Sequence, residues 1–313
     1  MVVRIIQHIL ESQEPFFEVD YSKILASESD IKKKFNQIWK TIIRKTELDI
    51  PISTALSEIK NMVLYDILDG NRSTIVSKTL GNNDVESGLF VINLIHTLKT
   101  LNARNCYIMI HTSYNRERGE KEFTYILRKI SLCAPLIKEY AIQNSISCSC
   151  IGMEKNYELT SLLNDIVEST KNGDFHVYFL FDYNERWGTT KEAQHILNAL
   201  PDIDVHIRHT KFQISGGWIP EKMSHSVFLY SQNGTTYSNW SSDELITLIA
   251  LALLEKLIHK GEILHKIYTT QEEVFQRYEL RELKLFNKVI HLREHPKKLF
   301  IMGSPIGVYQ FYY

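Results

Sequence analysis

The chain has 313 residues, of which 44% are hydrophobic and 23% are charged, and its formal net charge at pH 7 is −1. This length and composition suffice for a sizeable core in one large domain or two small ones. Charges of both signs are mixed along the sequence, which excludes the overall positive field of a chain that binds nucleic acid along its whole length. We therefore expect no nucleic-acid partner.

The first 60 residues are rich in both charges, and the spacing of apolar residues from Ser29 to Lys45 predicts a helix. Glu11 and Glu14 come too early for a secretory signal sequence. The longest apolar stretch of the chain, Leu245 to Leu254, is shorter than the ~20 residues of a membrane span. The sequence therefore predicts a soluble, cytoplasmic protein without a membrane span.

The centre of the chain alternates between short apolar segments, typical of buried strands, and longer segments with helical spacing. The predicted strands are Met62 to Leu68, Cys106 to Ile110, Ile146 to Ile151, Phe175 to Phe181, Val205 to Ile207 and Val227 to Tyr230. The predicted helices are Asp84 to Leu101, Glu120 to Gln143, Tyr157 to Lys171 and Thr189 to Leu200. This alternation favours the α/β class, with a mostly parallel central sheet and helices on both faces.

The tail of the chain has a different pattern. Residues Tyr268 to Arg293 predict a long charged helix, and an apolar, strand-like run begins at Leu299. We therefore expect a helical N-terminal extension over residues 1–60, an α/β core over 61–258 and a C-terminal extension, also helical, over 259–313. Each extension has the composition of a dimer arm, a lid or a layer packed on the core.

The cysteines and histidines show no metal-binding spacing. The four cysteines are Cys106, Cys133, Cys148 and Cys150, and none forms a Cys-x-x-Cys pair. Buried thiols in a reducing compartment are the favoured interpretation, and a redox pair of Cys148 and Cys150, which face one side of a strand, is the alternative. The twelve histidines include no zinc motif.

Parallel sheets of this kind bind ligands beyond the carboxyl ends of their strands. Polar residues follow four predicted strands there: Asp69 to Arg72 the first, His111 to Arg118 the second, Asp182 to Trp187 the fourth, and Arg208 the fifth. We therefore expect these four loops to converge at one edge of the sheet and to form a binding site.

The first loop combines a carboxylate, flexible backbone, an amide and a cation in Asp69-Gly70-Asn71-Arg72. Glycine lets the main chain approach a ligand closely, and a helix that begins downstream directs free N–H groups at an anion. A diphosphate is the ligand that this combination favours. The alternative is an ordinary turn, because Asp, Gly and Asn are also common turn residues.

Taken in order, these motifs resemble those of the cis-prenyltransferase family, of the undecaprenyl diphosphate synthase type, over residues 60–255. Asp69-Gly70-Asn71-Arg72 resembles the family's Asp-Gly-Asn-Gly-Arg without its second glycine, and Asn115 and Arg118 keep their places in a Ser-x-Glu-Asn-Trp-x-Arg-Pro motif. Asp182 to Trp187 is similar to Asn-Tyr-Gly-Gly-Arg-Trp. The family's Ile-Arg-Thr-Gly-Gly-Glu-x-Arg-x-Ser is similar to Ile207-Arg208-His209-Thr210, Gly216-Gly217 and Lys222-Met223-Ser224.

The resemblance implies an enzyme that acts on isoprenoid diphosphates, as a homodimer. Asp69 is then the catalytic residue beside the allylic diphosphate and a ligand of Mg²⁺, and Asn115 is a second catalytic residue. The residues implied to bind the diphosphates are Gly70, Asn71, Arg72, Lys78, Arg118, Arg186, Arg208, Lys222 and Ser224. Arginine suits this role because its planar fork meets two phosphate oxygens.

Several of these residues have a structural interpretation as well. Arg118 and Arg186 are equally well explained as ion-pair partners that stabilise the fold. Asn115 has the side chain of a residue that caps or braces a loop, while Tyr183 and Trp187 suit a core position.

The sequence also departs from the family at sites of function. Asn82 stands after Gly81 where the family has a histidine, and Tyr114 stands where it has a glutamate. The family's magnesium-binding glutamate falls near residues 237–239, Tyr-Ser-Asn, which carry no carboxylate; Asp243 and Glu244 replace it only if the loop bends back. Loss of a carboxylate ligand weakens Mg²⁺ binding.

Three hypotheses follow. The first is a divergent enzyme that joins an allylic diphosphate to isopentenyl diphosphate or to another prenyl diphosphate, or that ionises and rearranges or cyclises it. The second is a catalytically silent partner subunit of an active cis-prenyltransferase. The third is an unrelated doubly wound protein that binds a nucleotide or a sugar phosphate through the same loops.

Overall fold

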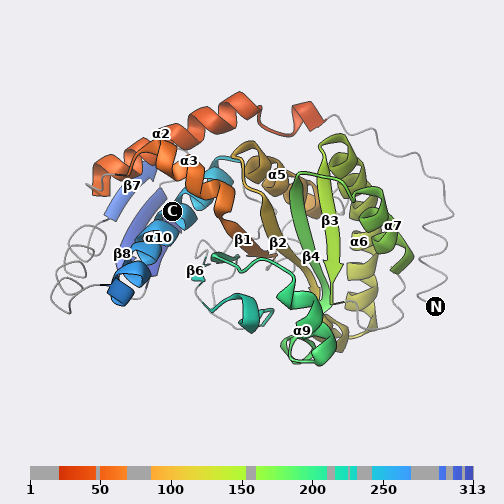
Figure 1. The fold of residues 1–313 in the computed structure, drawn as a ribbon. Helices are drawn as coiled ribbons and strands as arrows, with labels where there is room; N and C mark the ends of the chain where they lie inside the picture. The colour runs from red at the N-terminus through yellow and green to blue at the C-terminus, as the bar shows by residue number, and fades with distance from the viewer. Residues whose placement is uncertain are drawn as a thin grey trace.

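The computed structural model describes residues 21–46, 50–68, 86–152, 160–209, 216–224, 226–230, 242–268, 289–293, 299–304 and 307–312. Its centre is a six-stranded sheet with the order β3-β4-β2-β1-β5-β6, in which every neighbouring pair is parallel (Figure 1). The strands are β1 (Val63–Ile67), β2 (Asn105–Thr112), β3 (Ile146–Ile151), β4 (Phe175–Tyr183), β5 (Val205–Arg208) and β6 (Val227–Tyr230). The six predicted strands and the parallel α/β class are confirmed.

Strand β1 lies in the middle of the sheet, and all five of its residues are buried because both of its faces are covered. Its last residue, Ile67, is in register with Met109 of β2 on one side and with Arg208 of β5 on the other. Parallel pairing in this register brings the carboxyl ends of β1, β2 and β5 to one edge of the sheet, which we call the carboxyl edge.

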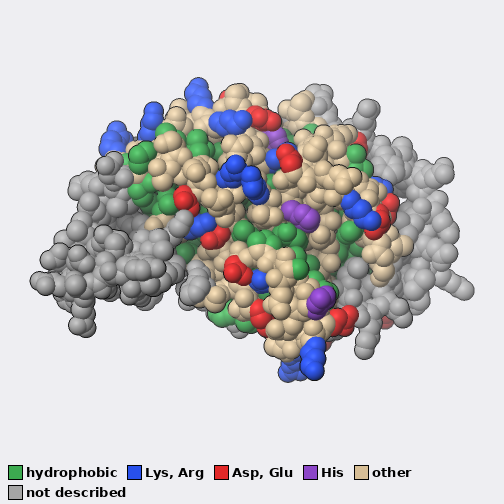
Figure 2. Space-filling view, in the orientation of Figure 1, with side chains coloured by type: hydrophobic (Ala, Val, Ile, Leu, Met, Phe, Trp, Pro, Cys, Tyr) green, Lys and Arg blue, Asp and Glu red, His purple; other side chains and the backbone are tan. Residues whose placement is uncertain are grey.

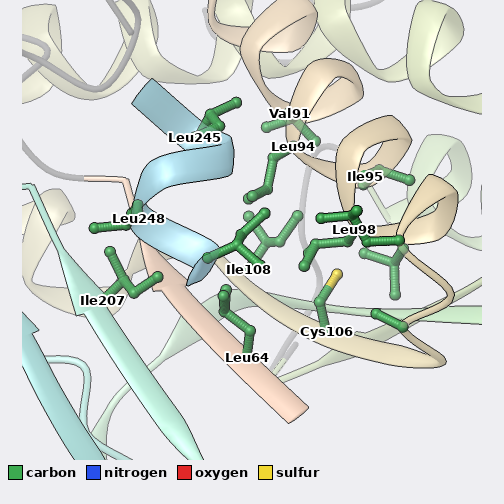
Figure 3. Close-up of a cluster of buried hydrophobic side chains, with 14 of the residues drawn as sticks. Leu64, Val91, Leu94, Ile95, Leu98, Cys106, Ile108, Ile207, Leu245 and Leu248 are labelled. Carbon is green, nitrogen blue, oxygen red and sulfur yellow. The ribbon is translucent and has the colours of Figure 1, made fainter. Parts of the chain in front are cut away.

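One face of the sheet packs against long helices. These are α2 (Glu28–Thr46), α3 (Ile52–Asn61), α5 (Glu86–Thr100), α6 (Glu120–Gln143), α7 (Thr160–Ser169) and α10 (Ser242–Tyr268). Figure 3 shows side chains of α5 and α10 meeting those of the sheet, with Leu94 and Leu248 above Leu64 and Ile108. We call this face the long-helix face.

Shorter elements cover the other face, which we call the short-helix face. They are α8 (Glu185–Gly188), α9 (Lys191–Asn198) and the 3-10 helix η3 (Pro220–Lys222). Trp187, Leu197 and Met223 of these elements and their flanks pack with Tyr65 and Tyr107 of the sheet. Two other 3-10 helices are η1 (Tyr21–Lys23), before α2, and η2 (Ser113–Arg118), after β2.

The described cysteines support the core interpretation, because all four are free thiols and three of them are buried. Burial raises the pKa of Cys148 to about 11 and that of Cys150 to about 12, so both remain protonated thiols at neutral pH. A protonated, buried thiol is a poor nucleophile for a redox reaction.

The C-terminal extension differs from the expectation of a long helix. Helix α10 ends at Tyr268. The prediction of helix is wrong over residues 289–293, which form strand β7 (Val289–Arg293). Strand β7 pairs antiparallel with β8 (Leu299–Ser304), and β8 pairs antiparallel with β9 (Gly307–Tyr312). Strand β7 contacts α2, and β9 contacts the edge strand β6. β-Branched and apolar residues such as Val289 and Ile290 favour a strand once a partner such as β8 is available. The strand-like run from Leu299 is confirmed.

Of residues 1–60, the structure describes 21–46 and 50–60, which contain η1, α2 and nearly all of α3; α2 includes the helix predicted from Ser29 to Lys45. Among the described residues, no helix is long and apolar enough to cross a membrane.

The start of β3 and the turn before β4 approach each other closely at Gly173. A β-carbon added there would lie 2.3 Å from the carbonyl carbon of Ile146 and from the nitrogen of Ser147, both of which are backbone atoms. We expect Gly173→Ala to lower the free energy of unfolding by more than about 2 kcal/mol, because the backbone must move to relieve the overlap. Urea unfolding measures the change.

Gly216→Ala is the matched control, because nothing lies within 4 Å of a β-carbon at that position. Its change should stay within about 1 kcal/mol. Equal costs for the two substitutions would contradict the close approach of β3 to the turn at Gly173.

Candidate active site at the carboxyl edge of the sheet

Residues from the carboxyl ends of β2 and β4 and from η2 form the first polar group of the carboxyl edge: His111, Asp182 and Arg116. Asp182 has a left-handed backbone, with φ of 54°, a conformation uncommon for a residue other than glycine. Its Oδ1 atom lies 3.4 Å from Nε of Arg116 and 3.8 Å from Nδ1 of the buried His111. The ring of Phe123 from α6 contacts both groups: its centroid lies 5.1 Å from the guanidinium of Arg116 and 5.7 Å from the centre of the His111 imidazole.

A second pair lies fully inside the protein at the ends of β1 and β5. Asp66 is 0% exposed and His209 is 2% exposed. Nε2 of His209 lies 3.1 Å from Oδ1 and 3.0 Å from Oδ2 of Asp66. The ring of Phe90 from α5 packs edge-on against the imidazole. A buried carboxylate needs such a partner, since loss of one member of a buried ion pair costs about 3–5 kcal/mol.

Arg208 belongs to the third group, on the short-helix face. Its side chain is almost fully buried, and Nη1 donates a hydrogen bond of 2.6 Å to the carbonyl oxygen of Gly216. The next residue, Gly217, has a positive φ of 89°. Its carbonyl oxygen accepts a hydrogen bond of 2.5 Å from the hydroxyl of Tyr65, and its N–H donates to the carboxylate of Glu185. The same Glu185 oxygen accepts from the N–H of Trp218 at 3.2 Å. The Gly216–Gly217 turn is therefore fixed to β1, β5 and α8.

The other residues predicted for the site have varied positions. Oδ1 of Asn115 accepts from the N–H and the hydroxyl of Thr112, at 2.9 and 2.8 Å, so it braces the start of η2 as the structural interpretation proposed. Arg186, on α8, is exposed. Arg118 ends η2, and its side chain lies outside the described residues. The predicted residues Asp69, Gly70, Asn71, Arg72 and Lys78 also lie outside the described part of the chain.

Two predicted diphosphate-binding residues, Lys222 and Ser224, lie at the opposite edge of the sheet from Arg208. Nζ of Lys222 donates to the carbonyl of Leu200 at 2.8 Å and to Asp202 at 3.1 Å, both before the start of β5. Ser224 comes three residues before β6 and is exposed. Because β5 and β6 are parallel, the residues just before β6 lie at the amino end of the sheet, so the structure does not bring these two residues together with Arg208.

The described residues do not provide a site for Mg²⁺. No group of three or more His, Cys, Asp or Glu side chains that could hold a metal ion occurs among them. Asp66 faces His209, Asp182 faces Arg116, and Asp243, the candidate replacement ligand, lies 2.7 Å from Nζ of Lys34 on α2. Each of these carboxylates thus already has a basic partner, and the prediction of Mg²⁺ depends on Asp69.

A hollow of about 660 Å³ lies at the amino edge of the sheet, the edge opposite to the carboxyl edge. Its basic side chains are Lys32, Lys60, Lys99 and Arg104. Lys32 pairs with Glu28 and Lys99 with Asp174, and both acids also line the hollow. Figure 2 shows further Lys and Arg side chains along α2 at the top of the molecule. The amino edge is therefore basic but partly neutralised.

Asp66 lies in the first predicted strand, and His209 and Glu185 lie within the motifs, yet sequence reasoning assigned no role to any of the three. Asp66 offered one usable signal: a carboxylate within an apolar strand run is an unusual buried residue that requires a partner. The identity of that partner depends on the pairing of β1 with β5, which joins residues 143 positions apart. Glu185 gave no signal, since its hydrogen-bond donors, the N–H groups of Gly217 and Trp218, become apparent only when the Gly216–Gly217 turn lies over α8.

His206 lies on the same strand face as Arg208, between the rings of Tyr65 and Phe228. Burial, and secondly the charge of Arg208, lower its pKa to about 3. In the unfolded chain histidine takes up its proton near pH 6.5, so the unfolded state binds more protons between these values. Stability contributed by His206 is therefore full above about pH 6.5 and is lost as the pH falls toward 3.

We expect His206→Phe to reduce the loss of unfolding free energy between pH 7 and pH 5 by roughly 2 kcal/mol. Urea unfolding at the two pH values measures this difference within each variant, so a constant packing change cancels. His195→Gln on α9 is the control, because His195 is exposed. The same pH dependence in all three proteins would contradict the buried, neutral state of His206.

The comparisons with known proteins agree with this fold. No family model matches the chain, and no curated protein matches its sequence. Among solved structures, the chain is similar to lavandulyl diphosphate synthase from Lavandula x intermedia, which was solved in complex with dimethylallyl diphosphate. The two have 14% sequence identity and a TM-score of 0.53, and the match covers 64% of this chain and 96% of the synthase chain. A probable undecaprenyl diphosphate synthase from Campylobacter jejuni has 16% sequence identity and a TM-score of 0.47. This match covers 60% of the present chain and 92% of the Campylobacter chain.

The likeness to lavandulyl diphosphate synthase bears on the fold and not on the reaction. The six-stranded parallel sheet with its covering helices corresponds to the architecture that the sequence motifs led us to expect. The chain is a divergent protein with a cis-prenyltransferase-like fold.

Proposed function

We propose that the protein is an enzyme that binds an allylic isoprenoid diphosphate at the carboxyl edge and breaks its bond to the diphosphate. The cation then joins isopentenyl diphosphate or another prenyl diphosphate, or it rearranges or cyclises. The observation that supports this most is the buried Arg208, held at the carboxyl edge of a cis-prenyltransferase-like fold and beside the end of β1, from which Asp69-Gly70-Asn71-Arg72 follows.

The charges at this edge suit the leaving group. When the carbon–oxygen bond of an allylic diphosphate breaks, the bonding electron pair stays with the diphosphate, whose extra charge cations stabilise. Arg72, Arg118, Arg186 and Arg208 are the arginines that we propose for this role, together with the N–H groups of Gly70 and Asn71. Arg116 offers a further guanidinium at the same edge. In the condensation reaction, the double bond of the second substrate attacks the cation, and the adduct then loses a proton.

Asp69 is the carboxylate that we propose beside the allylic diphosphate, with Asn115 fixing the neighbouring loop. Mg²⁺, where it is used, would be held by Asp69 and by the oxygens of the diphosphate itself, which Mg²⁺ prefers as ligands. It would supply positive charge to the leaving group.

Dimethylallyl diphosphate is the first substrate to test, because the lavandulyl diphosphate synthase structure contains it. The purified protein is incubated with dimethylallyl, geranyl or farnesyl diphosphate, with and without isopentenyl diphosphate and with Mg²⁺ or EDTA. Mass spectrometry of the products and release of pyrophosphate are the readouts. A new isoprenoid is the expected result, and intact substrates throughout would contradict an enzymatic function.

We expect Asp69→Ala to lower kcat by at least about a hundredfold, since Asp69 is proposed to act on the reacting diphosphate. Asp165→Ala is the matched control, because Asp165 lies on α7 and pairs with Lys138 away from the carboxyl edge. Unchanged turnover in the Asp69 variant would show that this aspartate has no catalytic role.

Arg208→Lys tests the guanidinium separately from the positive charge. We expect KM for the diphosphate to rise by about tenfold, because an ammonium group cannot bind two phosphate oxygens in one plane. Arg104→Lys, an exposed arginine at the amino edge, should leave KM unchanged. A larger effect at Arg104 than at Arg208 would move the diphosphate site to the amino edge. The melting temperature is recorded for both variants, since Arg208 also bonds Gly216.

A catalytically silent subunit of an active cis-prenyltransferase is the second candidate. It is favoured by the ion pairs that engage Asp66, Asp182 and Asp243, and by Asn82 and Tyr114 in place of the family's histidine and glutamate. Under this proposal the protein alone is inactive but raises the turnover of a bound active synthase. Size-exclusion chromatography with light scattering distinguishes a homodimer, which the enzyme proposal includes, from a monomer that awaits another subunit.

A further inference from the structure

The Asp66–His209 pair lies next to Arg208 along the chain, but on the other face of the sheet. Successive side chains of a strand alternate between faces, and the contacts follow that rule: His209 meets Phe90 of α5 on the long-helix face, while Arg208 meets the Gly216–Gly217 turn on the short-helix face. Two consecutive residues at the carboxyl end of β5 therefore make contacts on opposite faces of the sheet.

The contact on the long-helix face, between Asp66 and His209, joins two strands. Asp66 belongs to β1 and is in register with Ile207 of β5, and His209 follows β5 by one residue. Nε2 of His209 is nearly equidistant from both carboxylate oxygens, a geometry in which one N–H is shared between them. Rotation of the His209 main chain would break both contacts, so the pair limits movement of the adjacent Arg208 main chain.

Neither residue matches the family motifs that this sequence resembles. His209 stands where the resembled motif Ile-Arg-Thr has threonine, and Asp66 precedes Asp69 by three residues within an apolar strand. A carboxylate in this place has no access to water, and burying it is unfavourable unless an imidazole compensates.

We propose that Asp66 and His209 are positioning residues, which hold the Arg208 guanidinium where it binds the diphosphate of the substrate. This inference rests on the proposed function, because it requires Arg208 to be a diphosphate ligand. It predicts that loosening the pair weakens diphosphate binding even though neither side chain touches the ligand.

Inorganic pyrophosphate is the probe, and its Kd is measured by isothermal titration calorimetry well below the melting temperature of each protein. We expect Asp66→Asn and His209→Gln each to raise Kd by about tenfold or more, since small displacements of a binding group carry large penalties. The double variant replaces the pair by two amides without buried charge, so its Kd should rise by less than the product of the two single effects.

Ile166→Ala is the control for stability alone, because Ile166 is buried on α7, away from the carboxyl edge. It should lower the melting temperature and leave Kd unchanged. If an Asp66 or His209 variant does not fold, Phe90→Leu provides a milder test, since it removes the ring that packs against the imidazole and keeps an apolar side chain. It should raise Kd by a smaller factor.

The outcomes separate the two proposals. Single variants with lower melting temperatures but a wild-type Kd would overturn the positioning role and leave the proposed function intact, as would single effects that multiply independently in the double variant. A wild-type protein that binds neither pyrophosphate nor an allylic diphosphate would overturn the proposed function, and the positioning role with it.

Discussion

The burial of one carboxylate, Asp66, constrains the arrangement of the whole carboxyl edge. Strand β1 lies in the middle of the sheet and is covered on both faces. A charged side chain within it is not solvated by water, so another protein group must pair with it. His209 provides that partner, and its contact with Asp66 links the end of β5 to β1. The residue before it, Arg208, lies on the opposite face of the sheet. Arg208 and the Gly216–Gly217 turn then continue the connection to Glu185 on α8. One chain of contacts thus links α5, β1, β5, the crossover and α8.

The same edge brings acidic and basic side chains together. Two of its described carboxylates are engaged with basic groups, Asp66 with His209 and Asp182 with Arg116 and His111. Glu185 is engaged as well, by the N–H groups of Gly217 and Trp218. The guanidinium of Arg208 donates to the carbonyl oxygen of Gly216, which fixes its orientation beside the turn. An anion at the carboxyl edge therefore meets a guanidinium whose orientation is already set, which reduces the entropy lost on binding.

The sequence predicted the core of the fold well because its strands are short apolar runs between helical patterns, and that pattern is local. Strands β3 and β6 begin and end where the apolar runs of residues 146–151 and 227–230 do. The prediction of helix was wrong over β7. The charged residues of this part of the sequence indicated an exposed helix, whereas the strand depends on its pairing with β8. In the site, Arg208 lies at the carboxyl edge as predicted, while Lys222, which the family resemblance implied as a diphosphate ligand with Arg208, lies beside Leu200 and Asp202 before the start of β5. The role of Asp66 could not be predicted, because its partner is 143 residues away.

The most direct test of this account is the position of pyrophosphate in a crystal structure of the protein soaked with it. The account predicts phosphate density at the carboxyl edge, within hydrogen-bond distance of the Arg208 guanidinium, with the Asp66–His209 pair intact. Density confined to the hollow of the amino edge, beside Lys60 and Arg104, with none near Arg208, would contradict it.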